Sequence, residues 1–427
     1  MSKLEIFGGN ELNGIIEISG AKNATLPLMT AALLTGETVK FNRVPNLKDV
    51  EILMELLESL GVKTSYNPDT KKMELNAEKI TSHTASYELV SKMRASILVL
   101  GPLVARFKEA RVSLPGGCAI GTRPVDLHLE GLKVLGAEIE LEGGYVIAKA
   151  PEGLKGAKIH LSFPSVGATE NLLMAATLAK GTTIITNAAK EPEIVDLAEC
   201  LVKMGAEIKG IGTDTLTIIG KETLKGTEHT VVADRIEAGT FILAGVMAGG
   251  DLKIKHARLE HIESLAKVLH KAGIDLIEEG DLISIKRTRK KTIGIDVKMM
   301  GIDVMTEPYP GFPTDLQAQM MTVLTTAEGA GMITETVFEN RFMHVPELIR
   351  MGANITIHGS SALIRGVHSL KCADVMATDL RASASLVMAG LATQGKTTVH
   401  SIEHLERGYE DIVKKLSAVG AKLQKLD

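Results

Sequence analysis

One motif occurs six times in the sequence, and this repetition limits the folds that the chain can adopt. In each copy a helix-like segment ends in a glycine that precedes a strand-like segment; the glycines are Gly61, Gly136, Gly205, Gly273, Gly352 and Gly420. Successive glycines are separated by 75, 69, 68, 79 and 68 residues. Glycine suits a helix end because it adopts the left-handed conformation there without a steric cost. We therefore predict six copies of one structural unit.

A second segment, apolar almost throughout, precedes each of these helices. The six segments are 23–34, 95–105, 169–179, 238–248, 315–327 and 382–392. A helix without a polar face is buried on every side, and these segments are too short to cross a membrane. We therefore predict that they are core helices. Because single cores stop growing at about 250–300 residues, six units favour two domains of three units each. The boundary is expected near Lys225 to Val232, with ligands in the cleft between the domains.

Composition excludes several classes of protein. Hydrophobic residues make up 45% of the chain, and 48 Lys+Arg against 52 Asp+Glu give a net charge of −4, which argues against disorder and against a nucleic-acid-binding protein. We interpret the one basic run, Lys286 to Lys291, as a solvated hairpin tip. The three cysteines fit no disulfide framework and no CxxC zinc site. With no apolar signal segment at the first residues, we expect a cytoplasmic protein without a membrane partner.

Polar or charged residues stand at the start of the apolar segments. They are Lys22-Asn23, Arg94, Ser165 to Thr169, Asp234-Arg235, Thr314-Asp315 and Asp379 to Arg381. One interpretation is that these residues cap helices. The other is that they bind anions, because helix N-termini carry unpaired N–H groups and partial positive charge.

Two loops carry further candidates. The segment Leu114 to His128 is rich in proline and glycine and contains Cys118, whose thiol can react if it is exposed beside an arginine. His128 either serves as a base for Cys118 or caps the following helix. In the segment Tyr309 to Asp315, Asp315 either caps a helix or acts as a general base for a sugar hydroxyl.

The most specific pattern is a set of short motifs spread along the chain. They are Ser19-Gly20-Ala21-Lys22-Asn23, Met93-Arg94-Ala95-Ser96, Pro115-Gly116-Gly117-Cys118, Phe312-Pro313-Thr314-Asp315, Glu335 to Arg341, Ala377 to Ser383 and Arg407-Gly408-Tyr409. In these motifs the chain resembles the UDP-N-acetylglucosamine enolpyruvyl transferases of the EPSP synthase-like superfamily. The resemblance covers essentially all 427 residues.

This resemblance implies an α/β (α+β) fold with two inside-out α/β barrels. Each would contain three βαβαββ-like repeats around buried helices, with the active site in the cleft between them. It also implies that residues 1–21 join the second domain, so that 22–232 form the first domain and 1–21 plus 233–427 form the second.

The implied reaction transfers the enolpyruvyl group of phosphoenolpyruvate to the 3-hydroxyl of UDP-N-acetylglucosamine. Neither a metal nor an organic cofactor is implied. Cys118 would protonate the phosphoenolpyruvate methylene, and the epoxide fosfomycin would alkylate it. Asp315 would be the base for the sugar hydroxyl. Lys22, Arg123 and Arg407 would hold the phosphate and carboxylate of phosphoenolpyruvate.

The remaining implied substrate-binding residues are Asn23, Arg94, Pro124, Val125, Asp126, Leu127, Ser165, Val166, Gly167, Val337, Asp379 and Arg381, together with Arg123 and Asp315. One position departs from the pattern, because Phe163 stands where many members carry a lysine.

Three other interpretations compete with this one. An EPSP synthase would share the fold, but it lacks the Pro-Gly-Gly-Cys loop. A catalytically silent paralogue would bind the nucleotide sugar without turnover, although Cys118, Lys22, Asp315 and Arg407 are all present. A structural repeat scaffold would present a polar concave surface rather than reactive and charged motifs.

Overall fold

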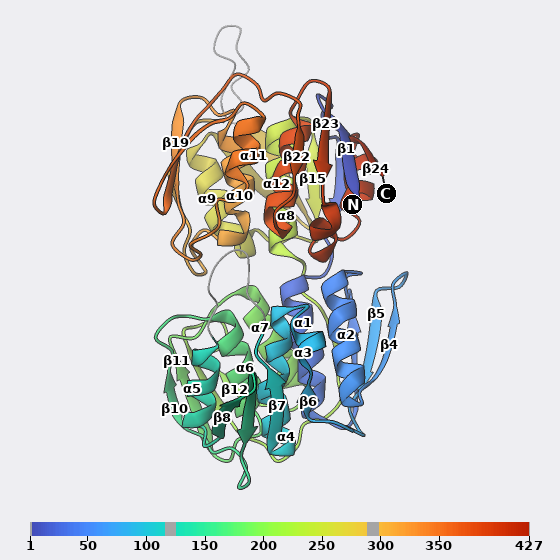
Figure 1. Ribbon diagram of the computed structural model, residues 1–427, viewed down its shortest axis with the longest axis vertical. Helices are drawn as coiled ribbons and strands as arrows, with labels where there is room; N and C mark the ends of the chain where they lie inside the picture. The colour runs from blue at the N-terminus through green and yellow to red at the C-terminus, as the bar shows by residue number, and fades with distance from the viewer. Residues whose placement is uncertain (1, 116–124, 288–298, 427) are drawn as a thin grey trace. The chain divides into compact units, whose positions relative to one another are not determined.

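The computed structural model describes residues 2–115, 125–287 and 299–426 (Figure 1). Leaving the undescribed positions aside, the chain divides into two compact units. The N-terminal unit runs from Gly20 to Val232, and the C-terminal unit combines Met1–Ser19 with Ala233–Asp427. Each unit has its own hydrophobic core.

Each core is built on helices from the six apolar segments. In the N-terminal unit these are α1 (Lys22–Ala31) with η1 (Ala32–Leu34), η2 (Arg94–Val99) with α4 (Leu100–Phe107), and α6 (Val166–Ala176). In the C-terminal unit they are α8 (Arg235–Ala248), η4 (Thr314–Leu316) with α10 (Gln317–Leu324), and α12 (Leu380–Leu391). Every residue of α6 from Ala168 to Ala176 is buried, and α12 is buried from Arg381 to its end. The prediction of core helices is confirmed.

More polar helices cover the outside of each core. They are α2 (Lys48–Leu60), α3 (Tyr87–Val90), α5 (Asp126–Val134), α7 (Pro192–Lys203), α9 (Glu263–Lys271), η3 (Leu259–Ile262), α11 (Val345–Arg350), α13 (Ile412–Ala418) and η5 (Ile402–Arg407). In α2 the buried residues include Val50, Leu53 and Leu57, a spacing that places them on one face. The six glycines that follow the repeated helices all have φ between 89° and 105°, as the left-handed end predicts.

Within the described residues each unit contains three four-stranded sheets. Those of the N-terminal unit are β14 (Glu228–Thr230)-β3 (Thr38–Asn42)-β5 (Lys72–Asn76)-β4 (Lys63–Asn67), β6 (Thr84–Ala85)-β7 (Glu109–Ser113)-β9 (Tyr145–Lys149)-β8 (Glu138–Glu142), and β10 (Lys158–His160)-β11 (Thr182–Thr186)-β13 (Thr215–Ile219)-β12 (Glu207–Lys209). In every sheet the first two strands are parallel and the other pairs antiparallel.

The C-terminal unit repeats this order. Its sheets are β2 (Gly14–Glu17)-β15 (Leu252–Lys255)-β17 (Leu282–Arg287)-β16 (Ile274–Glu279), β18 (Val304–Met305)-β19 (Ala330–Thr334)-β21 (Ser361–Arg365)-β20 (Asn354–His358), and β22 (Asp374–Met376)-β23 (Lys396–His400)-β1 (Lys3–Phe7)-β24 (Lys422–Leu426). The α/β fold with three βαβαββ-like repeats per unit is thus confirmed. In the described part of the chain the six sheets are separate from one another.

Three strands pair with partners far away in the sequence. Strand β1 lies between β23 and β24, with Lys3 opposite His400 and Leu426, as the blue strand beside the red ones in Figure 1 shows. It occupies the position that β21 has in the preceding sheet. Strand β2 pairs with β15, and β14 closes the sheet of β3. Each unit is therefore completed by a strand from a distant part of the chain.

The interpretation of the basic run as a hairpin tip is wrong for its first two residues. Lys286 and Arg287 lie within β17, opposite Asp275 and Ile274 of β16. These two residues continue the antiparallel ladder with β16, which a separate turn at positions 280–281 joins to β17. The rest of the run, 288–291, lies outside the described residues, so a tip there stays a prediction. Among the helices described, none combines the length and apolar character that a membrane crossing requires.

Candidate functional site

In the C-terminal unit the carboxylate of Asp315 lies between two buried arginines. The distance from Asp315 Oδ1 to Arg341 Nη2 is 2.7 Å, and from Asp315 Oδ2 to Arg381 Nη2 it is 3.4 Å. The arginine side chains are 5% and 4% exposed, whereas that of Asp315 is 26% exposed. Two charge-assisted contacts from opposite sides give the carboxylate a fixed orientation. Because part of it faces solvent, it can accept a proton from a ligand.

The local backbone explains how Asp315 reaches this position. Pro313 precedes the short helix η4, and Asp315 is the second residue of that helix. The N-cap of η4 is Pro313, so Asp315 stands inside the first turn and not at the cap position. Its backbone carbonyl accepts a hydrogen bond from Gln319 Nε2 at 3.0 Å.

Arg381 reaches Asp315 from the first turn of α12. Asp379 caps this helix, because its Oδ1 accepts from the backbone N–H groups of Arg381 and Ala382 at 2.8 and 3.0 Å. Burial opposes the charge of Arg381, but the neighbouring Tyr409 and Asp315 offset it and raise the pKa of the guanidinium. Arg381 Nη1 is buried and has no hydrogen-bond partner within the described protein, so a cationic N–H is available for an anionic ligand.

Two other predicted residues lie in this unit. Arg407 is the last residue of η5 and is half-buried. Tyr409, two positions later, is 2% exposed and lies under the guanidinium of Arg381, 5.3 Å from its ring centre. Val337 is half-buried in the segment after β19, and its N–H donates to the carboxylate of Glu335 at 2.9 Å.

In the N-terminal unit the predicted residues stand at helix starts. Lys22 is the first residue of α1, and its Nζ lies 3.3 Å from Asp49 Oδ2. Asn23 follows it and is half-buried. Arg94 is the first residue of η2 and is also half-buried. The N-cap residues of the two helices are Ala21 and Met93, so these three residues stand just inside the helices and not at the cap positions.

The segment Ser165-Val166-Gly167 begins α6. Ser165 caps the helix by accepting from the N–H of Ala168 at 3.3 Å, as the capping interpretation predicts. Its two successors are half-buried. Phe163, which stands where a lysine is usual, is 46% exposed.

His128 lies beside this segment, in the first turn of α5 rather than at its cap, which is Val125. It is 5% exposed, and its Nδ1 lies 3.0 Å from Asn171 Nδ2. Since an amide nitrogen donates, Nδ1 is the acceptor and the ring proton is on Nε2. Burial, followed by the charge of Arg94, lowers the pKa of His128 to about 4. The imidazole is therefore neutral at physiological pH.

This low pKa predicts how acidity affects stability. Between about pH 6.5 and pH 4 the unfolded chain binds a proton at His128 that the folded chain does not. Acidification through this window should therefore cost up to about 3 kcal/mol of unfolding free energy. Urea titrations of the wild type and of His128→Gln at pH 7, 5.5 and 4.5 measure this contribution as the difference between the two proteins.

The difference is needed because Glu237 titrates in the same range. Burial raises the pKa of Glu237 to about 7, so stability falls as pH rises from about 4.5 to 7, the opposite slope. Both proteins contain Glu237, and its effect cancels. Parallel stability curves for the two proteins would contradict a neutral buried His128.

Part of the predicted site lies outside the described residues, namely Cys118, Arg123 and Pro124. Val125 and Leu127 are half-buried, and Asp126 is exposed at the start of α5. The other two cysteines differ from one another. Cys200 is fully buried in α7, and burial raises the pKa of its thiol to about 12, whereas Cys372 is exposed.

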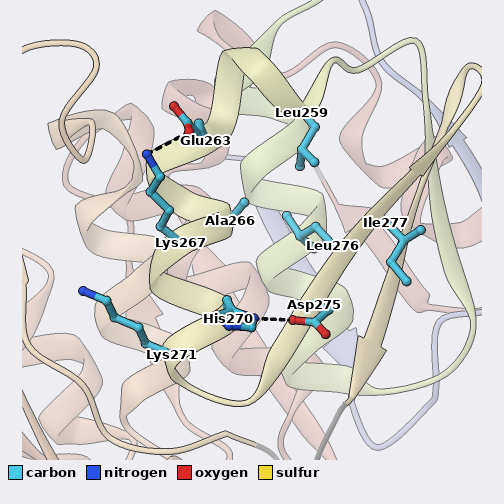
Figure 2. Close-up of a pocket in the computed structure, with 9 residues that line it drawn as sticks. All are labelled: Leu259, Glu263, Ala266, Lys267, His270, Lys271, Asp275, Leu276 and Ile277. Atoms are coloured by element: carbon cyan, nitrogen blue, oxygen red, sulfur yellow. Dashed lines mark hydrogen bonds and ion pairs between the residues drawn. The ribbon is translucent and has the colours of Figure 1, made fainter.

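A pocket of about 520 Å³ lies elsewhere, between α9 and β16. Figure 2 shows that its charged lining is largely paired within the protein, His270 with Asp275 at 2.6 Å and Lys267 with Glu263 at 2.7 Å. None of the predicted site residues that the structure describes lines it. The pocket is therefore separate from the predicted site residues described above.

Sequence reasoning missed Arg341 as a site residue and Glu335 as its neighbour. Both lie in a motif that carried the resemblance, but their spacing does not indicate contact with Asp315, which is 26 positions before Arg341. The signal that was present is a charged residue in a segment that the fold buries: Glu335 is 4% exposed and Arg341 5%. In the C-terminal unit the structure brings Asp315 and Arg381 together, as expected for one site.

Comparison with known proteins shows which family the chain resembles. The model of the EPSP synthase (3-phosphoshikimate 1-carboxyvinyltransferase) family matches residues 6–416. The chain is 57% identical to a UDP-N-acetylglucosamine 1-carboxyvinyltransferase from Rhodospirillum centenum, over 100% of this chain and 99% of that protein. It is 55% identical to the enzyme of the same name from Paramagnetospirillum magneticum, with the same coverage.

Solved structures agree with the fold. The enolpyruvyl transferase NikO from Streptomyces tendae matches with a TM-score of 0.88 and 25% identity, over 99% of both chains. An EPSP synthase from Acinetobacter baumannii matches with a TM-score of 0.77 and 19% identity over 100% of both chains, a likeness of fold.

Proposed function

The chain belongs to the EPSP synthase family, and from this we propose that it transfers the enolpyruvyl group of phosphoenolpyruvate to the 3-hydroxyl of UDP-N-acetylglucosamine, releasing phosphate. This is the first committed step of peptidoglycan synthesis. The observation that carries the assignment is the 53–57% identity, over the whole chain, to enzymes named for this reaction. The chain is a transferase, and its location is expected to be the cytoplasm.

The chemistry requires one acid, one base and several cations. Protonation of the phosphoenolpyruvate methylene makes its C2 electrophilic, and the sugar hydroxyl adds to C2 as it loses its proton. The resulting tetrahedral intermediate then loses phosphate and a proton from the methyl group, which restores the double bond. An acid and a base placed on opposite reactants each contribute about 10²–10⁴-fold.

We assign the base to Asp315. Its carboxylate is oriented by Arg341 and Arg381 and is still partly exposed, which suits a group that must take a proton from a ligand. Arg381 supports an anion subsite, because it is buried and its Nη1 has no hydrogen-bond partner among the described residues. Arg407, Asp379 and Val337 complete this group.

The N-terminal unit would supply the remaining contacts. Lys22 and Arg94 carry positive charge at helix starts, where anions are favoured. With Arg123 and Arg407, Lys22 would hold the phosphate and carboxylate of phosphoenolpyruvate. Asn23, Arg94, the segment Ser165-Val166-Gly167 and the segment Arg123 to Leu127 would bind the nucleotide sugar. Cys118 would be the acid.

Phosphate release from phosphoenolpyruvate tests the proposed reaction. We expect release that depends on UDP-N-acetylglucosamine, with a product that carries one enolpyruvyl group by mass. Release with shikimate 3-phosphate instead would keep the fold and change the substrate. Binding of the nucleotide sugar without release under either condition would support a silent paralogue.

A further inference from the structure

Glu335 is a buried carboxylate to which the reaction described above gives no task. It follows β19 directly and is 4% exposed. Its Oε1 accepts hydrogen bonds from Thr306 Oγ1 at 2.8 Å, Val337 N at 2.9 Å and Phe338 N at 3.1 Å. Its Oε2 accepts from Thr314 Oγ1 at 2.9 Å. One side chain therefore joins three separate segments of the C-terminal unit.

The Oε2 contact leads to Asp315. A threonine hydroxyl can donate one hydrogen bond, and Thr314 donates it to the carboxylate of Glu335. The lone pairs of Thr314 Oγ1 are therefore left to accept from other donors. Arg341 Nη1 donates to that oxygen at 3.1 Å, and Arg341 Nη2 binds Asp315 Oδ1 at 2.7 Å. The donor direction is thus fixed along the whole chain of contacts. Glu335 is linked to Asp315 through Thr314 and Arg341.

The Oε1 contacts lead to the other segment of the site. Two backbone N–H groups, those of Val337 and Phe338, converge on this one oxygen. They fix the backbone of the segment in which Val337 is proposed to contact the nucleotide sugar. The same carboxylate therefore contacts the proposed substrate-binding segment through Oε1. Through Oε2 it contacts Thr314, which in turn contacts Arg341, the residue that orients Asp315.

We propose that Glu335 is a positioning residue that joins the nucleotide-sugar segment around Val337 to the orientation of Asp315, acting through Thr314 and Arg341. This inference rests on the proposed function, since it assigns a role within that reaction. It differs from a purely structural role because the two oxygens make separate sets of contacts. We call the contacts of Oε1 with Thr306, Val337 and Phe338 one arm, and the contact of Oε2 with Thr314 the other. Loss of one arm should change one kinetic constant and spare the other.

Glu335→Gln separates the arms. The amide oxygen can keep the three donors on the Oε1 side, but the NH₂ group then faces Thr314 and donates where the carboxylate accepted. Thr314 must turn its proton away, and its contact with Arg341 is disturbed. We expect kcat to fall about 10- to 100-fold, while KM for UDP-N-acetylglucosamine changes less than about threefold. Glu335→Ala, which loses both arms, should change both constants.

Thr314 provides an independent test of the same chain of contacts. Thr314→Val should lower kcat as Glu335→Gln does, and Thr314→Ser, which keeps the hydroxyl, should retain most of the activity. The double variant Glu335→Gln/Thr314→Val should lose no more than either single variant, because both interrupt one path. Losses that multiply in the double variant would overturn the proposal.

The matched control is Thr334→Val. Thr334 ends β19 next to Glu335, but its hydroxyl bonds Ser361 Oγ at 2.9 Å and belongs to neither arm. Its kinetic constants should equal those of the wild type. All rates are expressed per folded molecule, with the folded fraction taken from urea unfolding curves. If Glu335→Gln does not fold, the comparison of kcat between Thr314→Ser and Thr314→Val tests the proposal.

The outcomes separate this inference from the proposed function. A wild type without UDP-N-acetylglucosamine-dependent phosphate release contradicts the function itself. An active wild type whose Glu335→Gln variant keeps its kcat, or loses only as much as Thr334→Val does, contradicts the inference alone.

Discussion

Asp315→Asn should lower kcat by about 10²–10⁴-fold and raise KM for UDP-N-acetylglucosamine far less. The amide keeps the size of the side chain and one oxygen for Arg341, but it cannot take the proton of the sugar hydroxyl. It also removes the negative charge between Arg341 and Arg381, both of which are buried. Steady-state phosphate release, with the substrates varied in turn, gives both constants.

Stability must be measured beside activity, because an uncompensated buried charge costs about 3–5 kcal/mol. Urea midpoints give the folded fraction to which the rates are normalised. Asp275→Asn is the control, since Asp275 pairs with a histidine, His270, in the outer layer of the same unit. Unchanged kcat in Asp315→Asn would remove Asp315 as the base.

Cys118→Ser should abolish alkylation by fosfomycin and lower turnover about 10²–10⁴-fold, as loss of the acid predicts. In the wild type the Cys118 sulfur is expected to open the epoxide: a C–S bond would form, a C–O bond would break, and the epoxide oxygen would take a proton. The protein then gains the whole mass of the inhibitor once. Intact-mass measurement followed by peptide mapping detects the adduct and its position.

The other two thiols provide the controls. Cys200 should stay unmodified, because it is fully buried and its pKa is raised to about 12. Cys372 is exposed and its Sγ donates to the Gln394 carbonyl at 3.2 Å. Because the adduct is expected on Cys118, Cys372→Ser should be alkylated like the wild type. An adduct on Cys372 or Cys200 in the Cys118→Ser protein would refute the assignment of the reactive thiol.

Much of the fold follows from local sequence signals. The apolar segments predict the core helices because a helix without a polar face must be buried, and the glycine positions predict where the outer helices end. The end of β17 was not predicted, because a conspicuous basic run suggested an exposed tip from Lys286 on, whereas Lys286 and Arg287 still pair with β16.

Pairings over long sequence distances could not be predicted in this way. Strand β1 takes the third position in its sheet, which β21 has in the preceding one, and nothing in its own five residues indicates a partner at His400. The resemblance, not the pattern, implied that residues 1–21 join the second domain. The position of a strand within a sheet depends on which edge the rest of the chain leaves unpaired.

The candidate site, like the fold, could be predicted only where the signal is local in the sequence. Asp315 and Arg381 were predicted from motifs, but the contacts of Asp315 with Arg381 and with Arg341 join three segments that meet only in the folded unit. Glu335 belongs to a predicted motif without a predicted role, because a carboxylate that accepts four hydrogen bonds looks in sequence like any solvated acid.

The position of β1 also sets an order of events during biosynthesis. About 390 residues separate Phe7 from its partner Lys396, so at ~5–20 residues per second the ribosome needs roughly 20–80 s to deliver that partner. The Gly20–Val232 unit is complete once β14 has emerged and can fold while translation continues. The last sheet must wait for both β23 and β24. For that interval β1 lacks both of its neighbours in the sheet, so Leu4 and Ile6, which the finished fold buries, stay exposed on the growing chain.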